Sequence, residues 1–281
     1  MDPIVTVAEL IALRPHVPVL IDARRSREAF LTSHLAGARF VGLDRELAGP
    51  VASASEGGRH PLPSPEAFAK TLSRLGVTPK SDVVVYDDQS GAISAARVWW
   101  MLRAYGHDRV RVLDGGWAAI TDAASRGELA LESGEAPDAQ SQHPVRAWRG
   151  ETVDRTAVDR ARVDPSSLVI DVRAADRFRG ENETMDPVAG HIPGAINAPY
   201  ATTNLDDAGR FLDATTLRDR YVALLRGRTI DRTIVHCGSG VTACHTLLAL
   251  DRAGLHGAKL YVGSWSEWCR RPELPRETRV D

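Results

Sequence analysis

The sequence has few cysteines, no long apolar run and almost no net charge. Three cysteines in 281 residues argue against a disulfide framework and favour a reducing compartment, so we expect the cytoplasm. No apolar stretch reaches the ~18 residues of a membrane span, and the N-terminus shows no secretory signal. With a net charge of −2, neither nucleic acid nor an anionic membrane is expected as a partner.

The sequence also lacks the spacings that hold metals and phosphates. No set of His, Cys and carboxylate residues has metal-ligand spacing, and no glycine-rich stretch matches a phosphate or dinucleotide motif. We therefore expect no metal site. The length of 281 residues fits two domains of about 130–140 residues each.

The two halves of the chain repeat one another in four short blocks. Val-Leu-Ile-Asp-Ala-Arg returns as Leu-Val-Ile-Asp-Val-Arg, and His-Leu-Ala-Gly-Ala returns as His-Ile-Pro-Gly-Ala. The blocks, each with its counterpart, are residues 19–24 and 168–173, 34–38 and 191–195, 84–87 and 234–237, and 113–117 and 261–265. Four matches in one order, spaced by roughly 150 residues, indicate a duplication.

Within each half, short apolar runs alternate with helix-like stretches. In the first half we predict helix 65–75, with Ser64 as its N-cap and Gly76 past its end. A strand at 83–86, a helix at 92–105 and a strand at 109–113 follow. This order predicts an α/β fold in which each domain has a parallel sheet flanked by helices on both faces.

The domain boundaries follow from composition and from the repeat. Residues 125–148 begin with a stretch rich in Gly, Ser, Glu, Pro and Ala that has no clear apolar period, and we predict an interdomain linker there. The N-terminal domain is then 1–124 and the C-terminal domain 149–281.

Cys237 is the residue most suited to covalent chemistry. It opens the run Cys-Gly-Ser-Gly-Val-Thr at 237–242, between an apolar strand and a helix beginning near Ala243. Ligands of open α/β sheets bind beyond the carboxyl ends of strands. The loop N–H groups and the positive end of the helix favour thiolate over thiol there. The matching position in the first half is Asp87, which cannot act as a sulfur nucleophile, so only the second half is expected to be catalytic.

These motifs together resemble the two-domain rhodanese family of sulfurtransferases. The resemblance rests on Asp-x-Arg after a strand, His-Ile-Pro-Gly-Ala, and the Cys-Gly-Ser-Gly-Val-Thr loop followed by Gly-Ser-Trp. It implies two tandem rhodanese-like domains, the first catalytically inactive. Thiosulfate sulfurtransferases place basic residues in the loop where this chain has Gly238 and Ser239. The loop is instead similar to that of 3-mercaptopyruvate sulfurtransferases.

The resemblance also implies partners for Cys237. Ser239 fits the family's Ser two residues after the nucleophile, and His60 and Asp44 match the His and Asp that support it. Such a set can relay a proton to or from the reacting groups. Arg177 matches the family's substrate-binding arginine, which forks onto a carboxylate. The other loop residues expected to contact substrate are Gly238, Gly240, Val241 and Thr242.

One position departs from the family pattern. Mercaptopyruvate members carry a second binding Arg about nine residues after the first, where this chain has Asp186. Either Arg179 or another cation takes over, or the preferred donor is not mercaptopyruvate.

The leading functional hypothesis is transfer of sulfur from 3-mercaptopyruvate through a Cys237 persulfide to a thiol such as thioredoxin, or to cyanide. Pyruvate is released and no cofactor is needed. A thiosulfate sulfurtransferase is the alternative, and a non-catalytic rhodanese-like binding module is less favoured because the loop is equipped to react. A phosphatase of the His-Cys-x5-Arg type would need Arg where the chain has Ala243.

Residues shared by both halves are expected to be structural, because only one half has the thiol. We expect hydrogen bonding at turns for the two histidines and local ion pairs for the two arginines. These residues are His34, His191, Arg24 and Arg173. Cys244 is expected to pack on the buried face of its helix. Cys269 is expected to be a peripheral structural or incidental thiol, with a regulatory redox role as the less favoured alternative.

Overall fold

The computed structural model describes residues 1–13, 18–139 and 141–278. The chain forms two compact units, each discontinuous in sequence. The first contains Met1–Gly49, Pro63–Gly150 and Gly209–Phe211, and the second contains Pro50–Leu62, Glu151–Ala208 and Leu212–Asp281. A stretch of the first repeat therefore belongs to the unit built mainly from the second.

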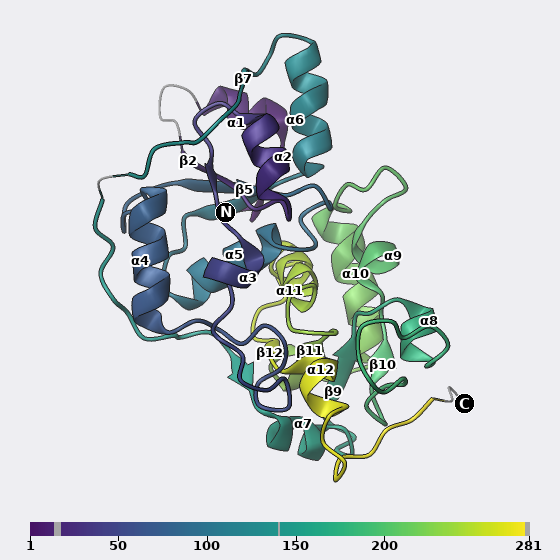
Figure 1. The fold of residues 1–281 in the computed structure, drawn as a ribbon. Coiled ribbons are helices and arrows are strands. Elements are labelled where there is room, and N and C mark those ends of the chain that lie inside the picture. The colour runs from purple at the N-terminus through teal and green to yellow at the C-terminus, as the bar shows by residue number, and fades with distance from the viewer. Residues whose placement is uncertain (14–17, 140, 279–281) are drawn as a thin grey trace. The chain divides into compact units, whose positions relative to one another are not determined.

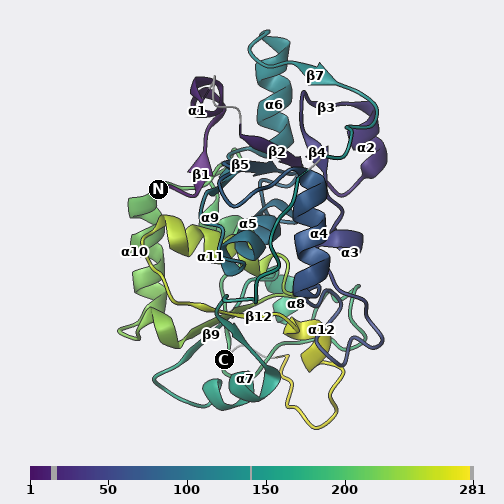
Figure 2. The same ribbon diagram turned by 90° about the vertical axis from the view of Figure 1, so that its left-hand side faces the viewer.

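The first unit is built on a parallel five-stranded sheet with the order β1-β6-β5-β2-β4. Its strands are β1 (Ile4–Val5), β2 (Val19–Asp22), β4 (Arg39–Phe40), β5 (Val83–Tyr86) and β6 (Val110–Leu113). Helices α1 (Val7–Ala12), α2 (Arg27–Thr32) and α6 (Gly116–Ser125) lie above this sheet in Figures 1 and 2. Helices α3 (Leu43–Glu46), α4 (Pro65–Leu75) and α5 (Ala95–Ala104) lie below it. A short antiparallel pair joins β3 (His34–Leu35) to β7 (Leu131–Glu132).

The second unit repeats this plan with the order β10-β9-β11-β12-β8, again parallel. Its strands are β8 (Thr152–Val153), β9 (Leu168–Asp171), β10 (Ile196–Asn197), β11 (Thr233–His236) and β12 (Lys259–Tyr261). In Figures 1 and 2, α11 (Ala243–Arg252) and α7 (Arg155–Ala161) lie on opposite faces of the sheet. The remaining helices are α8 (Ala175–Phe178), α9 (Tyr200–Asn204), α10 (Ala214–Leu225), the 3-10 turn Ile230–Arg232 and α12 (Ser264–Trp268).

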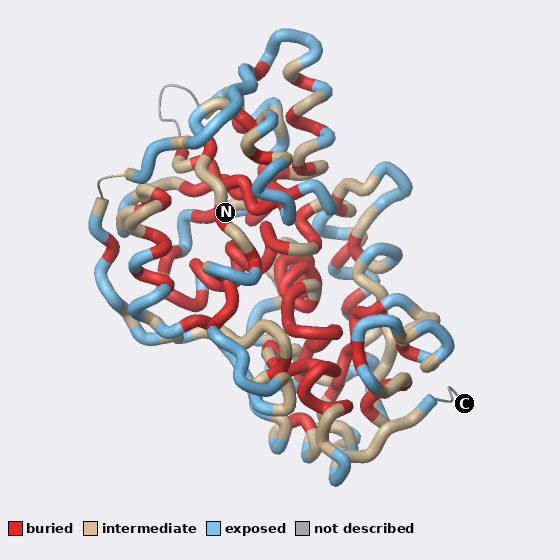
Figure 3. The backbone as a smooth tube through the Cα atoms, viewed as in Figure 1, coloured by how far each residue is buried: buried red, intermediate tan, exposed pale blue. Residues whose placement is uncertain are grey.

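The predicted fold class and duplication are confirmed by this arrangement. In both sheets the strand of the first repeated block lies beside the strand of the third, since β2 pairs with β5 and β9 pairs with β11. The central strands are buried on both faces, as Figure 3 shows, which explains their continuous apolar runs. Because parallel strands end at one edge, the residues that follow β9 and β11 are brought together.

Local signals explain where the helices begin and end. Helix α4 starts and stops where predicted, because Ser64 Oγ accepts a hydrogen bond from the Ala67 N–H at 3.2 Å and Gly76 adopts a φ of 82°. The predicted helix at 92–105 begins later, at Ala95. The Asp87 carboxylate accepts hydrogen bonds from the N–H groups of the intervening turn and holds it in a loop conformation.

The segment predicted as an interdomain linker, 125–148, lies within the first unit. The His143 N–H donates to Ser73 Oγ at 2.9 Å, and the Trp148 ring lies 5.1 Å from the Phe68 ring. The predicted boundaries of the linker and of the two domains remain predictions. In the described ranges no helix has the length and apolarity that crossing a bilayer requires.

Candidate active site

Cys237 lies immediately after β11 and is held by the start of α12. Its N–H donates to Ser264 Oγ at 3.2 Å, and its carbonyl accepts from the Trp265 N–H at 3.0 Å. The side chain is 2% exposed. The next carbonyl, of Gly238, accepts from the Ser266 N–H at 2.8 Å. The loop backbone is therefore fixed on one side by the Gly-Ser-Trp turn that the repeat brings to the same edge of the sheet.

Gly240 lets the loop turn tightly toward helix α11. It adopts a φ of 74°, and a Cβ at this position would lie 2.4 Å from the Val262 carbonyl oxygen. Only glycine fits such a turn at such a distance. Val241 is buried, and Thr242 occupies the N-cap position of the ten-residue α11. The positive end of this helix therefore faces the loop that carries Cys237.

Asp87 shows what the equivalent loop of the first repeat can bind. Its carboxylate accepts hydrogen bonds from five backbone N–H groups at 2.8–3.2 Å. The donors are Gln89, Gly91, Ile93, Ser94 and Ala95. Burial raises the pKa of Asp87, although these hydrogen bonds oppose that effect. A loop at this end of the sheet can thus surround an anionic side chain with backbone donors.

His60 and Ser239 meet within the second unit. His60 Nδ1 lies 2.8 Å from Ser239 Oγ, within hydrogen-bonding distance. The segment 50–62 is anchored on α12, because the Arg59 N–H donates to Ser266 Oγ and the Gly57 N–H donates to Glu267 Oε1, each at 3.1 Å. Gly58 lies so close to Gly263 that a Cβ would come within 2.4 Å of the Gly263 carbonyl oxygen.

Asp44 lies in the first unit, whereas His60 and Ser239 lie in the second. It is an exposed residue of α3 and lines a cavity of about 520 Å³ together with Arg25, Arg45 and Glu46. Its role beside His60 stays a prediction that rests on the family resemblance.

Arg177 is held close to the loop by an acidic neighbour. Its guanidinium forks onto Glu183, with Nη2 donating to Oε1 at 2.7 Å and to Oε2 at 2.9 Å. A Cβ placed on Gly238 would lie 3.6 Å from either terminal nitrogen of Arg177. The side chain is 19% exposed, so the guanidinium remains accessible.

Arg59 is a cation beside the loop that sequence reasoning missed. A Cβ on Gly238 would lie 3.3 Å from its Nη2, nearer than either terminal nitrogen of Arg177. Arg59 pairs with the buried Asp186, the residue found where the family has its second arginine. Arg179, the cation named as a possible replacement, is exposed and forks onto Glu181 instead. No local pattern marks Arg59 in the sequence, since its position depends on where segment 50–62 docks.

Arg173 connects the loop to the core of the unit. It pairs with Asp171 at 2.7 Å and with Glu183 at 3.2 Å. Burial alone would lower the pKa of Arg173, but the charges of Asp171, Glu183 and Cys237 outweigh this effect and raise it. The predicted local ion pair is confirmed, as it is for Arg24 with Asp22 at 2.8 Å.

The histidines that occur in both repeats have equivalent structural contacts. Nδ1 of His34 lies 2.8 Å from the Phe30 carbonyl oxygen, and Nδ1 of His191 lies 2.8 Å from that of Phe178. Each imidazole also stacks on the phenyl ring of the same residue. The expected role of these histidines in turns is therefore confirmed. His236, beside Cys237, is fully buried, and burial lowers its pKa and favours the neutral ring.

The other two cysteines are buried thiols. Cys244 donates from Sγ to the Gly240 carbonyl at 3.4 Å. Cys269 packs against Trp265 and Trp268, and its pKa is raised, first by burial and then by the charge of Asp186. Cys269 is thus a buried core residue, and the prediction of a peripheral position is wrong because its side chain is part of the apolar cluster that includes Trp265 and Trp268.

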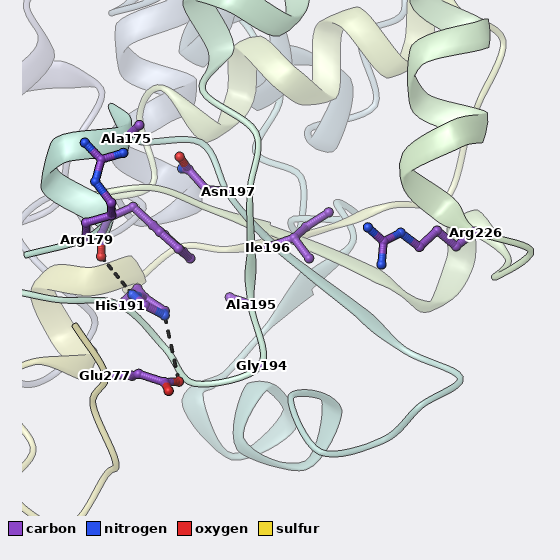
Figure 4. A pocket seen from close by; sticks show the side chains of 10 residues that line it. Ala175, Arg179, His191, Gly194, Ala195, Ile196, Asn197, Arg226 and Glu277 are labelled. Carbon is purple, nitrogen blue, oxygen red and sulfur yellow. Dashed lines mark hydrogen bonds and ion pairs between the residues drawn. The ribbon is translucent and has the colours of Figure 1, made fainter. Parts of the chain in front are cut away.

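A separate cavity of about 550 Å³ lies in the second unit, and none of residues 237–242 lines it. Figure 4 shows Arg179, Asn197 and Arg226 around it, with His191 pointing toward Glu277. The His191 and Glu277 side chains approach to 3.9 Å. This cavity holds none of the residues predicted to react.

Comparisons with known proteins find relatives of this chain among the rhodanese-like sulfurtransferases. A family model described as "Rhodanese-like domain" matches residues 6–123 and 155–271. A protein of Pseudomonas aeruginosa named "Probable 3-mercaptopyruvate sulfurtransferase" is 44% identical over 263 residues, 92% of this chain and 89% of that protein. The "Putative thiosulfate sulfurtransferase SseB" of Mycobacterium tuberculosis is 40% identical over 258 residues, 91% of this chain and 87% of that protein.

This chain is also similar to a solved structure. The crystal structure of SseA from Escherichia coli, described among 3-mercaptopyruvate sulfotransferases, matches with a TM-score of 0.74 and 32% identity. The match covers 94% of this chain and 99% of that one.

Proposed function

The chain belongs to the rhodanese family, and from this membership we propose that it is a sulfurtransferase acting on 3-mercaptopyruvate. Relatives whose names contain 3-mercaptopyruvate sulfurtransferase align with this chain over most of its length and most of their own. The single observation that carries the proposal is the approach of His60 Nδ1 to 2.8 Å from Ser239 Oγ, two residues after Cys237. A pair of side chains that can move protons, two residues along the chain from the candidate nucleophile, supports the proposal.

In the first step, the Cys237 thiolate attacks the thiol sulfur of 3-mercaptopyruvate. The bond between that sulfur and carbon breaks, and its electron pair leaves with the carbon as the enolate of pyruvate. The Ser239–His60 pair supplies a proton to this enolate. The sulfur stays on Cys237 as a persulfide, which the N–H groups of the loop and the start of α11 stabilise.

In the second step, an acceptor thiolate attacks the outer sulfur of the persulfide. The S–S bond breaks, the acceptor leaves with the sulfur and the Cys237 thiolate is restored. We propose a thioredoxin-type protein or another thiol as acceptor, with cyanide serving in an assay. A cytoplasmic location is part of the proposal, supported by three free thiols.

Asp44 and Arg177 complete the proposed site. Arg177 would bind the donor carboxylate. The position of its partly exposed guanidinium near Gly238 supports this role. Asp44 is proposed as the residue that orients His60, on the family resemblance alone. Gly238, Gly240, Val241 and Thr242 would shape the loop around the transferred sulfur.

The test uses the full chain and a single turnover. Treated with 3-mercaptopyruvate without acceptor, the protein should release pyruvate and gain about 32 Da, one sulfur atom, on the peptide containing Cys237. Cys237→Ser should abolish both effects, whereas Cys269→Ala, which removes a buried core thiol, should retain them. Full pyruvate release by Cys237→Ser would overturn the proposal.

Transfer from thiosulfate is a second candidate. The putative thiosulfate sulfurtransferase among the relatives and the two guanidiniums beside Gly238 favour it, because thiosulfate is a dianion. The ratio of kcat/KM for the two donors decides between them. A ratio favouring thiosulfate would assign the protein to that reaction instead.

A further inference from the structure

In the first unit a segment without regular structure, residues 134–139, runs beside the edge strand β4. Proteins commonly cover an edge strand in this way, because its outer backbone groups are otherwise unpaired. Arg39 Nε of β4 donates to the Pro137 carbonyl at 3.1 Å. Glu135 and Asp138 line the cavity of about 520 Å³ together with β4.

Both ends of this segment are fixed to the ends of helices. The Gly134 N–H donates to the Leu31 carbonyl at 2.8 Å, at the end of α2. The Ala139 N–H donates to the Arg74 carbonyl at 3.0 Å, at the end of α4. The segment therefore passes from the end of α2, along β4, to the end of α4.

The segment is acidic and its carboxylates face arginines. The Glu135 carboxylate accepts from Arg27 Nη2 at 2.5 and 2.7 Å. The Asp138 carboxylate lies 3.7 Å from Arg74 Nη1. Opposite charges thus accompany the backbone contacts at both ends of the segment.

The corresponding path in the second unit is open. Here β10 is the edge strand, and α8 and α10 take the places of α2 and α4. The cavity of about 550 Å³ follows this path from Arg179 after α8, past Ile196 of β10, to Arg226 after α10, as Figure 4 shows. Among the residues that the structure describes, no counterpart of segment 134–139 borders this cavity.

The ends of α4 and α10 show this difference at a single position. Each helix ends at a residue with left-handed backbone, Gly76 with a φ of 82° and Arg226 with a φ of 48°. A Cβ on Gly76 would lie 2.9 Å from Ala139 Cβ, so the segment occupies the space of a side chain. Arg226 has an exposed side chain there, and it makes no hydrogen bond or ion pair with any described residue. Helix termination alone does not favour arginine in this conformation.

Glu277, which also lines the open cavity, is not the counterpart of the missing segment. It forms an antiparallel bridge with His191, as Glu132 pairs with His34 in the first unit. Segment 134–139 begins two residues after Glu132 and still passes along β4. Glu277 therefore corresponds to a residue that precedes the segment, and its carboxylate leaves the path along β10 open.

We propose that this cavity binds an extended acidic segment of a partner protein, about six residues long like segment 134–139. The bound segment lies along β10, and its carboxylates pair with Arg179 at one end and Arg226 at the other. Arg179 gives up its exposed ion pair with Glu181, which contributes little to stability. None of residues 237–242 lines the cavity, so the proposal does not depend on the reaction at Cys237.

The probe is a fluorescent peptide with the sequence of residues 131–141, which includes Glu135 and Asp138. The first unit already holds its own copy of this segment, so the peptide reports on the second. Its anisotropy, measured with the full chain at low salt, should give a Kd below about 0.5 mM. The peptide with Glu135→Gln and Asp138→Asn should bind at least about tenfold more weakly. No binding of the acidic peptide at about 1 mM protein would overturn the proposal.

Variants of the two arginines locate the binding. The double variant Arg179→Gln/Arg226→Gln should weaken binding at least about tenfold. The control Arg160→Gln/Arg220→Gln removes the same charge from exposed positions outside the cavity, and should change Kd less than about twofold. Arg226→Gly should weaken binding about threefold or more with an equal or higher Tm, since glycine adopts left-handed backbone without strain. Equal binding by the unmodified protein and the first double variant would place the peptide elsewhere and overturn the proposal.

Two further measurements test other occupants of the cavity. Removal of residues 279–281 should leave Kd within about threefold. Binding that appears only after this removal would mean that the chain's own residues fill the cavity, and would overturn the proposal. Self-association of the unmodified protein that Arg179→Gln/Arg226→Gln abolishes would assign the cavity to a second copy, with the same consequence.

Discussion

His60 Nδ1 lies 2.8 Å from Ser239 Oγ, although 179 residues separate them in the sequence. The contact forms inside the second unit because segment 50–62 packs on α12. The hydroxyl follows Cys237 by two residues, so a proton moving between imidazole and hydroxyl stays close to the sulfur. Substitutions of His60 and Ser239 that leave the Cys237 thiol in place can therefore test the roles of these two side chains.

Loss of either member of the pair is expected to slow pyruvate formation. His60→Gln and Ser239→Ala should each lower kcat about 10²- to 10⁴-fold, because each removes the same general acid–base function. The double variant should be little slower than either single one, since the residues act as a unit. Steady-state pyruvate release measures this, with exposed His256→Gln as a control expected to keep its kcat. If both single variants retain kcat within about threefold, the pair has no part in the reaction.

Two adjacent glycines test the docking of segment 50–62. Gly57 and Gly58 have φ values of 86° and 81°, so alanine at either position meets the same backbone strain of about 1–2 kcal/mol. Only Gly58 has a close neighbour, because a Cβ there would lie 2.4 Å from the Gly263 carbonyl oxygen. The nearest atom to a Cβ on Gly57 is Pro61 Cβ at 3.7 Å.

Gly58→Ala should therefore displace Arg59 and His60, and lower kcat/KM at least about tenfold beyond the effect of Gly57→Ala. It should also lower Tm more than Gly57→Ala does. Kinetics and thermal unfolding of the two variants give the comparison. Equal effects of both substitutions would mean that the docking of this segment does not depend on its close approach to Gly263.

Acid should destabilise the first unit through two buried histidines. Burial lowers the pKa of His107 and of His143 below the ordinary value of 6.5, and their rings lie 6.5 Å apart. Below about pH 6.5 the unfolded chain binds protons that the native state does not, so the free energy of unfolding falls. Each histidine contributes a slope of up to about 1.4 kcal/mol per pH unit, until the pH reaches its lowered pKa in the native state.

Urea unfolding at pH 7.5 and pH 5.5 measures this loss of stability. His107→Asn should lose less stability between the two pH values than the unmodified protein, because one of the two titrating groups is gone. The same loss in both proteins would assign the acid sensitivity to other groups, among them His236, whose pKa burial also lowers.

The elements that the sequence predicted well are those with local causes. Ser64, Pro65 and Gly76 mark the two ends of α4 through local interactions, and the apolar run at 83–86 is a central strand. The predicted start of α5 is too early because the Asp87 carboxylate accepts hydrogen bonds from the N–H groups of Ser94 and Ala95. Apolar periodicity does not reveal such an interaction between side chain and backbone.

The residues of the candidate site likewise differ in whether a local sequence pattern reveals them. Cys237 and its loop follow from the pattern of strand, small residues and helix, and Ser239 from its spacing within that loop. Arg59 has no such signal. Its position depends on the path of a segment without regular structure, and only the contacts of that segment with Ser266 and Asp186 bring it to Gly238.

The path of residues 50–62 means that the two repeats are not independent modules. The first repeat has Asp87 where the second has Cys237, so it carries no thiol at this position. Residues 50–62 of the first repeat nevertheless belong to the second unit. Deletion of the first repeat would therefore remove Arg59 and His60 from the unit that holds Cys237. The second repeat expressed alone would therefore lack both side chains.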